Sequence, residues 1–373
     1  MEQIDRTKVS KRIVGLDLIR VIAIFLVLLS HAIPANTHPN TLSVGGQIIN
    51  ATFVSIGHLG VPIFFMLSGY FLIDRDYETT SAINWFYRHK VAPMAICFVL
   101  WISIYQLFLW GVLHRSLTLM GWLEDLLFFS RQGGNPNGLG IYIWNAWFMP
   151  AILGLYLAVP FISRAVYHFP RRGLWWIYLL VVSQTMVMPT ATLLLNAFGK
   201  PGFSISQLDL SYFGGISATY FFAGYLIKTS QRQWSKWLLM ISGVTLAVAI
   251  WLTQYQFQFT DYAKYTGGQL EMPYQFLLLL PCAAAFVQLA ARWHQSTHQW
   301  LNQGMAYLSG LSFGVFLCHR LISIALDKTG WLTGQSLTKQ TLLNMLILLA
   351  GGYLIAMIIH KIPWLDRWLL LNH

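Results

Sequence analysis

Hydrophobic residues occur along the chain in long runs separated by short polar segments, and each run is long enough to cross a bilayer. This pattern predicts an all-α, polytopic transmembrane helical bundle of about ten spans, forming one domain over residues 1–373. The predicted spans are residues 13–33, 51–73, 91–113, 143–161, 174–195, 212–228, 237–257, 273–291, 305–326 and 340–360.

Composition supports a membrane protein. Hydrophobic residues make up 56% of the chain and charged residues only 10%, whereas soluble domains carry about 25% charged residues. The formal net charge of +11 does not indicate nucleic-acid binding, because the basic residues are distributed among the loops between apolar runs. That distribution is typical of membrane topology signals.

Lysine and arginine positions predict the orientation. An even number of spans places both termini on one side, and a cytoplasmic N-terminus puts sixteen of the 24 Lys and Arg residues inside and seven outside, with Arg20 in the membrane. This bias favours an N-in, C-in arrangement. The N-terminal segment resembles a signal peptide, but Arg20 interrupts its apolar run and Pro34-Ala35 is a poor cleavage site, so we expect an uncleaved first span.

The first run carries three ionisable residues, Asp17, Arg20 and His31. On an α-helix, Arg20 and His31 are about 16 Å apart along the axis and within about 20° of each other around it. Asp17 lies within about 40° of His31 and one turn from Arg20. Because ionisable groups in a membrane normally face protein or a wet cavity, this face predicts a functional site.

A structural alternative stays open for these residues: Asp17 and Arg20 could form a buried ion pair that only fixes helix packing, and His31 could meet headgroups. His31 is the candidate reactive group, because an imidazole can take a proton from an alcohol near neutral pH. Arg20 is permanently charged and suits a phosphate or a carbonyl group rather than proton transfer.

Several other segments could contribute to the same site. The glycines and Pro62 in residues 57–70 predict either a local break that lines a cavity or a kinked packing helix. The basic cluster in residues 88–90 is either a topology anchor or a docking site for a phosphate-bearing ligand. Trp147 is either an interfacial anchor or a sugar-binding aromatic residue. His319, near the outer end of the ninth run, is expected at the level of His31.

Other motifs indicate packing. The Gly-x-Ser-x-Gly pattern at residues 310–314 lies within an apolar span, where small residues favour close helix contact over a hydrolase elbow. Three cysteines, Cys97, Cys282 and Cys318, fall inside apolar runs at unrelated spacings, which predicts neither disulfides nor a metal site. We expect no metal at His294 and His298, because no zinc-protease glutamate accompanies them.

Taken together, these motifs resemble the integral-membrane acyltransferase-3 family of bacterial sugar O-acyltransferases. Arg20 and His31 reproduce an Arg-x10-His signature on the first helix, and residues 61–70 resemble a Pro-x-Phe-Phe-x-x-Ser-Gly-Tyr/Phe segment. The resemblance covers essentially the whole chain. The overall organisation of the chain is similar to that of the stand-alone members that O-acetylate enterobacterial common antigen.

The resemblance implies a multi-pass enzyme of the bacterial cytoplasmic (inner) membrane. It would transfer an acyl group from cytoplasmic acyl-CoA, usually acetyl-CoA, to a sugar hydroxyl of a lipid-linked or cell-surface glycan, with membrane lipids around it. His31 would take part in acyl transfer, as general base or transient acyl carrier, and Arg20, supported by Asp17, would hold the donor. The further expected contacts are Arg88, Lys90, Ser68, Gly69 and Tyr70 for the donor, and His58, Trp147 and His319 for the acceptor.

Two rival interpretations belong to other classes of protein. A glycolipid or polysaccharide transporter or flippase would share the hydropathy pattern, although transporters often show repeat symmetry and paired broken helices, and only residues 57–70 suggest a break here. A membrane scaffold would use the polar face of the first helix only for packing. An assay with labelled acetyl-CoA and candidate glycans separates the three.

Overall fold

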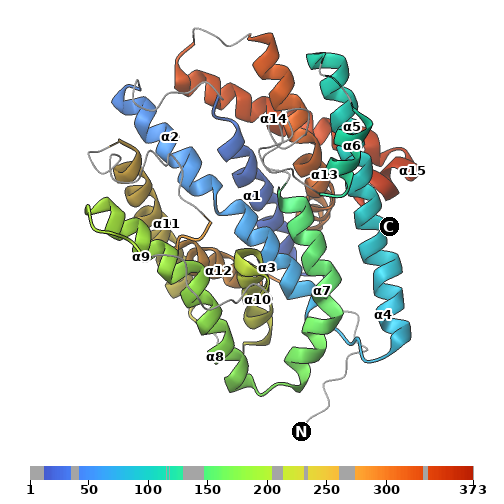
Figure 1. Ribbon diagram of the computed structural model, residues 1–373, viewed down its shortest axis with the longest axis vertical. Helices are drawn as coiled ribbons and strands as arrows, with labels where there is room; N and C mark the ends of the chain where they lie inside the picture. The colour runs from blue at the N-terminus through green and yellow to red at the C-terminus, as the bar shows by residue number, and fades with distance from the viewer. Residues whose placement is uncertain are drawn as a thin grey trace.

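The computed structural model describes residues 12–34, 42–114, 116, 118–128, 147–203, 213–230, 234–259, 274–330 and 335–372. Within these ranges the chain forms helices and no strand (Figure 1). Eight helical segments there are long and apolar enough to cross a membrane. The predicted all-α, polytopic bundle is therefore confirmed for the part of the chain that is described.

The helices follow the predicted runs. The first half contains α1 (Val14–His31), α2 (Val44–Gly57), α3 (Gly60–Leu72), α4 (Thr80–Phe86), the π-helical turn η2 (Tyr87–Val91), α5 (Ala92–Leu113) and α6 (Leu119–Leu126). The second half contains α7 (Phe148–His168), α8 (Arg171–Val182), η5 (Ser183–Val187), α9 (Met188–Ala197), α10 (Gly215–Thr229), α11 (Lys236–Phe259), α12 (Leu279–Ala290), α13 (Gln299–Thr329), α14 (Leu337–His360), α15 (Pro363–Leu365) and η8 (Asp366–Leu370).

Each predicted run corresponds to one helical segment, but the lengths differ. The second begins at Val44, ahead of the predicted residue 51, and divides into α2 and α3 at His58 and Leu59. Two segments, α10 with 15 residues and α12 with 12, are shorter than the eight membrane-length segments. The first residues of the runs predicted at 143, 212 and 273 lie outside the described residues.

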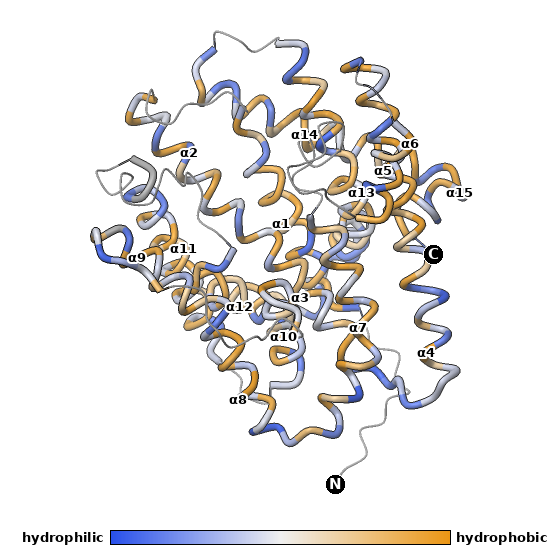
Figure 2. The backbone as a smooth tube through the Cα atoms, viewed as in Figure 1, coloured by the Kyte–Doolittle hydropathy of each residue, from blue (hydrophilic) through white to orange (hydrophobic). Residues whose placement is uncertain are grey.

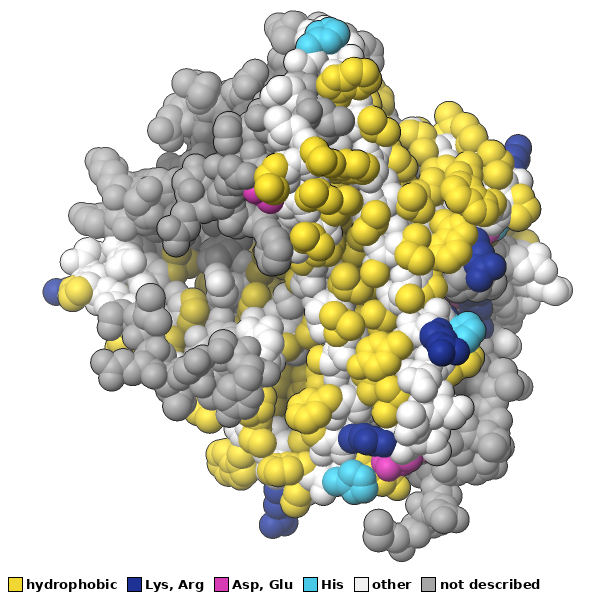
Figure 3. All heavy atoms as spheres, turned by 45° about the vertical axis from the view of Figure 1, so that its right-hand side comes forward, with side chains coloured by type: hydrophobic (Ala, Val, Ile, Leu, Met, Phe, Trp, Pro, Cys, Tyr) yellow, Lys and Arg dark blue, Asp and Glu magenta, His cyan; other side chains and the backbone are white. Residues whose placement is uncertain are grey.

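Helix α1 lies at the centre of the bundle (Figure 1) and packs against α13, α3, α2 and α12. Hydrophobic residues dominate the helices, and hydrophilic residues concentrate towards helix ends and connecting segments (Figure 2). Hydrophobic side chains also cover much of the described part of the face in Figure 3, where the few charged side chains lie mainly towards its right and lower edges. Large apolar side chains such as Phe161, Trp176 and Trp237 are exposed. A surface of this kind is suited to lipid rather than water.

The two ends of the bundle differ in character. At the end where α1 begins, the side chains of Arg12, Arg164, Arg171, Lys228 and Arg292 bond to neighbouring segments; we call this the basic end. At the end where α1 finishes lie His31, His58 and His319, and we call this the histidine end. The end of α14 returns to the basic end, because His360 contacts Tyr307 in the first part of α13. An N-in, C-in orientation remains a prediction that this arrangement allows.

Backbone contact between α3 and α10 fixes the position of α3. A Cβ atom added at Gly69 would lie 1.7 Å from the carbonyl oxygen of Phe221, and one at Gly224 would lie 1.8 Å from that of Met66. Only glycine permits helices to approach so closely. Gly69 therefore belongs to the contact between α3 and α10.

The C-terminal turn η8 is packed into the bundle rather than exposed as a tail. Trp101 of α5 donates a hydrogen bond from Nε1 to the carbonyl oxygen of Leu369, at 3.0 Å. A Cβ atom added at Gly314 would lie 2.3 Å from the side chain of Leu370. Part of the Gly-x-Ser-x-Gly pattern therefore serves packing, as predicted. Each of the three cysteines is buried and free.

Candidate active site

The histidine end brings two imidazole rings together. His31, the last residue of α1, and His319 of α13 have ring centroids 5.2 Å apart. His319 has no exposed surface, and its Nδ1 lies 2.6 Å from the carbonyl oxygen of Phe316. His31 is half-buried. The expectation that His319 lies at the level of His31 is confirmed.

The local structure of α13 explains why His319 is fixed. A neutral imidazole that donates from Nδ1 to a backbone carbonyl keeps its Nε2 as an acceptor. Phe316 also packs its ring against those of Phe148 and Phe64, at 4.9 and 6.4 Å between centroids. These contacts hold the turn that carries His319, whose ring is inclined by 34° to that of His31.

An aromatic group lies beside the histidine pair. His58 occupies the break between α2 and α3, where its Nδ1 lies 2.8 Å from the carbonyl oxygen of Val54. The ring of Tyr274 lies 5.0 Å from that of His58 and 5.3 Å from that of Trp147. His58 is also close enough to His31 to act on it electrostatically. The segment is therefore interrupted at residues 58–59, and this break places the ring of His58 beside that of Tyr274.

Arg20 lies further down α1, towards the basic end. Its guanidinium donates a hydrogen bond to the hydroxyl of Ser309, at 3.2 Å, and lies 5.8 Å from the ring centroid of Phe71. Tyr156 of α7 lies within electrostatic range of Arg20 and shares a hydrogen bond with Ser68. Arg20 is half-buried. These partners come from α13, α3 and α7, so Arg20 occupies the meeting point of four helices.

Asp17 has a different hydrogen-bonding partner from the one expected. Both of its carboxylate oxygens accept hydrogen bonds from Arg12, at 2.6 and 3.0 Å, and Arg12 also donates to the carbonyl oxygen of Ala306. The hydrogen bonds that Arg12 donates to the Asp17 carboxylate raise the pKa of Arg12. Asp17 acts on Arg20 only through its charge. Arg12 thus links the start of α1 to α13, and Asp17 provides a negative charge below Arg20.

The three residues predicted to line the donor channel have different neighbours. Ser68 meets Tyr156, Gly69 packs against α10, and the ring of Tyr70 lies 5.9 Å from the ammonium group of Lys228. Of the three, Ser68 lies nearest to the surroundings of Arg20, and Tyr70 extends towards the basic end.

The two basic residues expected to bind the donor near the start of α5 differ in their exposure. The turn η2 leaves Arg88 exposed and Lys90 half-buried. Lys90 lies within electrostatic range of Arg75, and Arg75 within range of Tyr156. A line of positive charge therefore leads from Lys90 through Arg75 towards Arg20.

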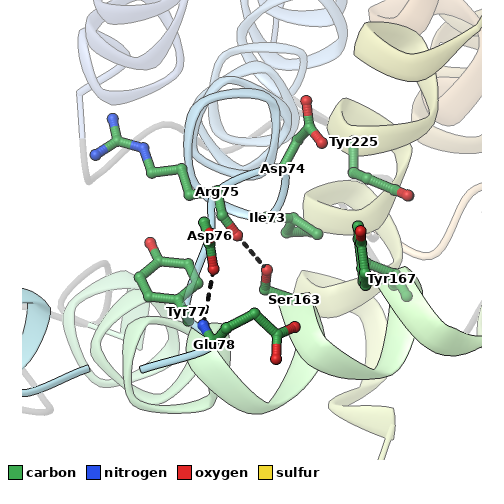
Figure 4. Close-up of a pocket in the computed structure, with 10 residues that line it drawn as sticks. Ile73, Asp74, Arg75, Asp76, Tyr77, Glu78, Ser163, Tyr167 and Tyr225 are labelled. Atoms are coloured by element: carbon green, nitrogen blue, oxygen red, sulfur yellow. Dashed lines mark hydrogen bonds between the residues drawn. The ribbon is translucent and has the colours of Figure 1, made fainter. Parts of the chain in front are cut away.

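The segment that carries Arg75 is held rigidly. Together with α7 and α10, this segment after α3 borders a cavity of about 30 Å³ (Figure 4). The cavity is large enough for a water molecule. Ser163 donates a hydrogen bond to the carbonyl oxygen of Arg75 at 2.6 Å, and Arg75 itself donates to that of Phe71 at 2.7 Å. Figure 4 shows the Arg75 side chain pointing away from Ser163 and Tyr167. Burial raises the pKa of Tyr77 in this segment to about 12, so its phenol stays neutral.

Comparison with known families identifies the chain. The family model described as an acyltransferase domain, that of the acyltransferase-3 family, matches residues 13–361. The chain belongs to this family. Comparisons with curated proteins and with solved structures found no match. Membership establishes an acyltransferase, and therefore a site where an acyl donor and an acceptor meet.

The described part of the site brings together imidazole, guanidinium, hydroxyl and aromatic side chains. Among the described residues, no group of three or more His, Cys, Asp or Glu side chains could hold a metal ion.

Three residues near the site were not singled out from the sequence: Tyr156, Tyr274 and Arg75. Tyr156 lies in an apolar run without any distinguishing neighbour, and Tyr274 lies at the start of another. Arg75 appeared only as one of many basic residues on the predicted inner side. Their positions depend on contacts between helices distant in sequence, and no local pattern records those contacts.

Tyr156 offers a specific test of the surroundings of Arg20. We expect Tyr156→Phe to lower kcat/KM for the acyl donor about fivefold, because the change removes one hydrogen bond to Ser68 near Arg20. The matched control is Tyr167→Phe, an exposed tyrosine on the same helix. Steady-state kinetics at varied donor concentration measure both. Equal losses in the two variants would exclude a role for the Tyr156 hydroxyl at the donor site.

Proposed function

We propose that this acyltransferase moves an acetyl or other acyl group from cytoplasmic acyl-CoA to a hydroxyl of a lipid-linked or cell-surface glycan on the other side of the membrane. The observation that carries the proposal is the arrangement along α1. His31 meets His319 at one end, and Arg20 lies at a meeting point of helices eleven residues below, towards the basic end. This spacing suits an extended donor that enters at the basic end.

Positive charge marks the proposed donor side. Arg75 and Lys90 provide cations for the phosphates of coenzyme A near the basic end. Arg20, about 16 Å below His31 along the helix axis, would contact the arm between the nucleotide and the thioester. The polar surroundings of Arg20, including Ser309 and Tyr156, provide hydrogen-bonding groups for the amides of that arm.

The proposed acceptor side combines aromatic surfaces with the ring of His58. Sugar rings present C–H faces that pack on aromatic planes, and hydroxyls that need polar partners. Trp147 and Tyr274 form an aromatic pair, and His58 lies against Tyr274. We propose that this group holds the sugar so that one hydroxyl reaches His31.

The transfer step needs one base and one acid. In the direct route, the acceptor oxygen attacks the thioester carbonyl carbon while His31 takes the hydroxyl proton. The new C–O bond forms, the C–S bond breaks, and the proton returns from His31 to the coenzyme A sulfur. In the alternative route, an imidazole nitrogen of His31 attacks first and carries the acyl group to the acceptor. In both routes His319 would orient His31, which makes His319 a positioning residue.

The direct test uses purified protein in liposomes with radiolabelled acetyl-CoA and isolated glycans, with enterobacterial common antigen among the candidate acceptors. The proposal predicts ester-linked label on one class of glycan and release of free coenzyme A in equal amount. Acid quenching during turnover distinguishes the routes, because only the carrier route leaves label on the protein. Movement of glycan across the bilayer without labelling would instead indicate a transporter.

Arg20 provides a further prediction. We expect Arg20→Ala to raise KM for the acyl donor about tenfold or more, with a smaller change in kcat, because the guanidinium binds the donor far from the reacting atoms. The matched control is Arg172→Ala, which removes an exposed cation from the start of α8. Donor titrations of both variants at saturating acceptor provide the measurement. A fall in kcat with an unchanged KM in Arg20→Ala would contradict a binding role.

A further inference from the structure

A second cavity lies on the opposite face of α1 from the proposed active site. It has a volume of about 350 Å³ and is bordered by α1, the start of α11 and the end of α12, a size typical of ligand pockets. The lining residues are Gly15, Leu18, Ile19, Ile22, Lys236, Phe286, Leu289, Ala290, Arg292 and Trp293. Apart from Lys236 and Arg292, the groove is apolar.

Helix geometry separates this groove from the active site. The α1 residues that line it are centred about 160° around the helix from Arg20 and His31. Ile22 is 38% exposed, so the groove opens on the outer surface of the bundle. An occupant would therefore lie against the back of α1 and would not reach the reacting groups.

The charges and aromatic residues place one end of the groove at a membrane interface. Lys236 is the first residue of α11, and Arg292 follows α12 and donates a hydrogen bond to the carbonyl oxygen of Trp234. Trp234, Trp237 and Trp293 are exposed nearby, and tryptophan is typical of the headgroup level. Two cations and no carboxylate are found among the described residues that line the groove. This combination is complementary to an anionic headgroup above an apolar chain.

We infer that this groove binds one anionic phospholipid. Its phosphate would lie between Lys236 and Arg292, and one acyl chain would run along Leu18, Ile19 and Ile22 on the back of α1. Basic pockets between transmembrane helices are known to bind anionic headgroups. Zwitterionic lipids offer the same chains but lack net charge, so the two cations select the anionic headgroup.

The bound lipid would strengthen the start of α1. The amides of Val14 and Gly15 donate hydrogen bonds to the carbonyl oxygens of His294 and Trp293, at 3.1 and 2.9 Å. A phospholipid in the groove contacts both sides of this junction, because Gly15 and Trp293 both line it. Ligands that bind only the folded state raise its stability, so the anionic lipid should stabilise the protein.

Lipid binding to the full-length protein tests the inference. Native mass spectrometry in detergent, with dioleoylphosphatidylglycerol or dioleoylphosphatidylcholine added at the same concentration, gives the affinity for each lipid. We expect tighter binding of the anionic lipid, and a higher thermal unfolding midpoint in its presence. Equal binding of the two lipids to the wild-type protein would overturn the inference without the need for any variant.

Variants then locate the site. Lys236→Ala should weaken binding of the anionic lipid about fivefold, and the double change with Arg292→Ala should weaken it further by a similar factor. Ile22→Trp, which fills the groove, should weaken binding of the anionic lipid while both cations remain. The matched control combines Arg172→Ala and Lys361→Ala, which remove two exposed cations outside the groove. Unchanged binding of the anionic lipid in Lys236→Ala and in the double variant would contradict the assignment.

Competition excludes other ligands. Inorganic phosphate at millimolar concentration should not displace the lipid, because it lacks the acyl chain that the apolar floor binds. Displacement by phosphate would indicate a simple anion site, and displacement by acetyl-CoA would indicate a donor site. Either result would overturn the lipid assignment. Neither depends on acyl transfer, so failure here is distinguishable from failure of the proposed function.

Discussion

Replacement of His31 by alanine is expected to lower kcat for acyl transfer by a factor of about 10² to 10⁴, the usual contribution of a positioned acid–base group. The physical reason is that an alcohol is a poor nucleophile until its proton has an acceptor, and His31 is the half-buried imidazole at the end of α1. If His31 carries the acyl group instead, its loss removes the first step altogether. Transfer of label from acetyl-CoA to glycan, measured in the linear phase, gives kcat.

The control for His31→Ala is His294→Ala, because His294 is an exposed histidine at the basic end. It should retain wild-type kcat. Both proteins should show wild-type thermal unfolding midpoints in detergent, which separates chemistry from folding. His319→Ala should cause a smaller loss of kcat and shift the pH profile, as expected for a residue that orients the imidazole. Wild-type turnover in His31→Ala would refute the assigned role.

Gly69→Ala is expected to destabilise the fold by about 3 kcal/mol or more, at or above the upper end of ordinary overpacking costs. The added Cβ would lie 1.7 Å from the carbonyl oxygen of Phe221, so α3 and α10 would have to separate along their contact. Backbone atoms cannot move aside as a flexible side chain can. Equilibrium unfolding in detergent, followed by tryptophan fluorescence, measures the change in the free energy of unfolding.

Gly154→Ala provides the matched control for Gly69→Ala. Gly154 lies inside α7, and nothing comes within 4 Å of a Cβ atom added there. Alanine is favoured over glycine in a helix interior by about 0.5–1 kcal/mol, so this variant should be neutral or slightly more stable. A Gly69→Ala protein of normal stability but impaired donor binding would contradict the packing role and favour the predicted channel-lining role.

Much of the fold follows from hydropathy, because the membrane requires long apolar helices. The sequence does not show where these helices stop within the protein. The stretch around Gln47 is polar enough to be assigned to a loop, yet it lies in α2, where Gln47 accepts a hydrogen bond from the hydroxyl of Tyr255 in α11. The burial of the C-terminal turn is equally hidden in the sequence. Leu369 is buried, and its carbonyl oxygen accepts a hydrogen bond from Trp101. Neither contact has a local sequence signal.

The candidate site was predictable where its residues share one helix. Arg20 and His31 lie on one face of α1 because of their spacing, and the helix count placed His319 at the level of His31. Partners that come from other helices were harder to predict. Asp17 is close in sequence to Arg20, but its carboxylate bonds to Arg12, and Tyr156 reaches Arg20 from α7. Helix packing decides these pairings, and one sequence does not specify it in advance.

We propose that an acyl group crosses the membrane through this bundle and leaves at His31. Sealed vesicles with the basic end outward, enclosing a glycan acceptor in their lumen, test this directly when radiolabelled acetyl-CoA is added outside only. We expect label on the enclosed glycan with the wild-type protein and none above background with His31→Ala. Label confined to acceptor added on the donor side, or equal labelling by the two proteins, would contradict it.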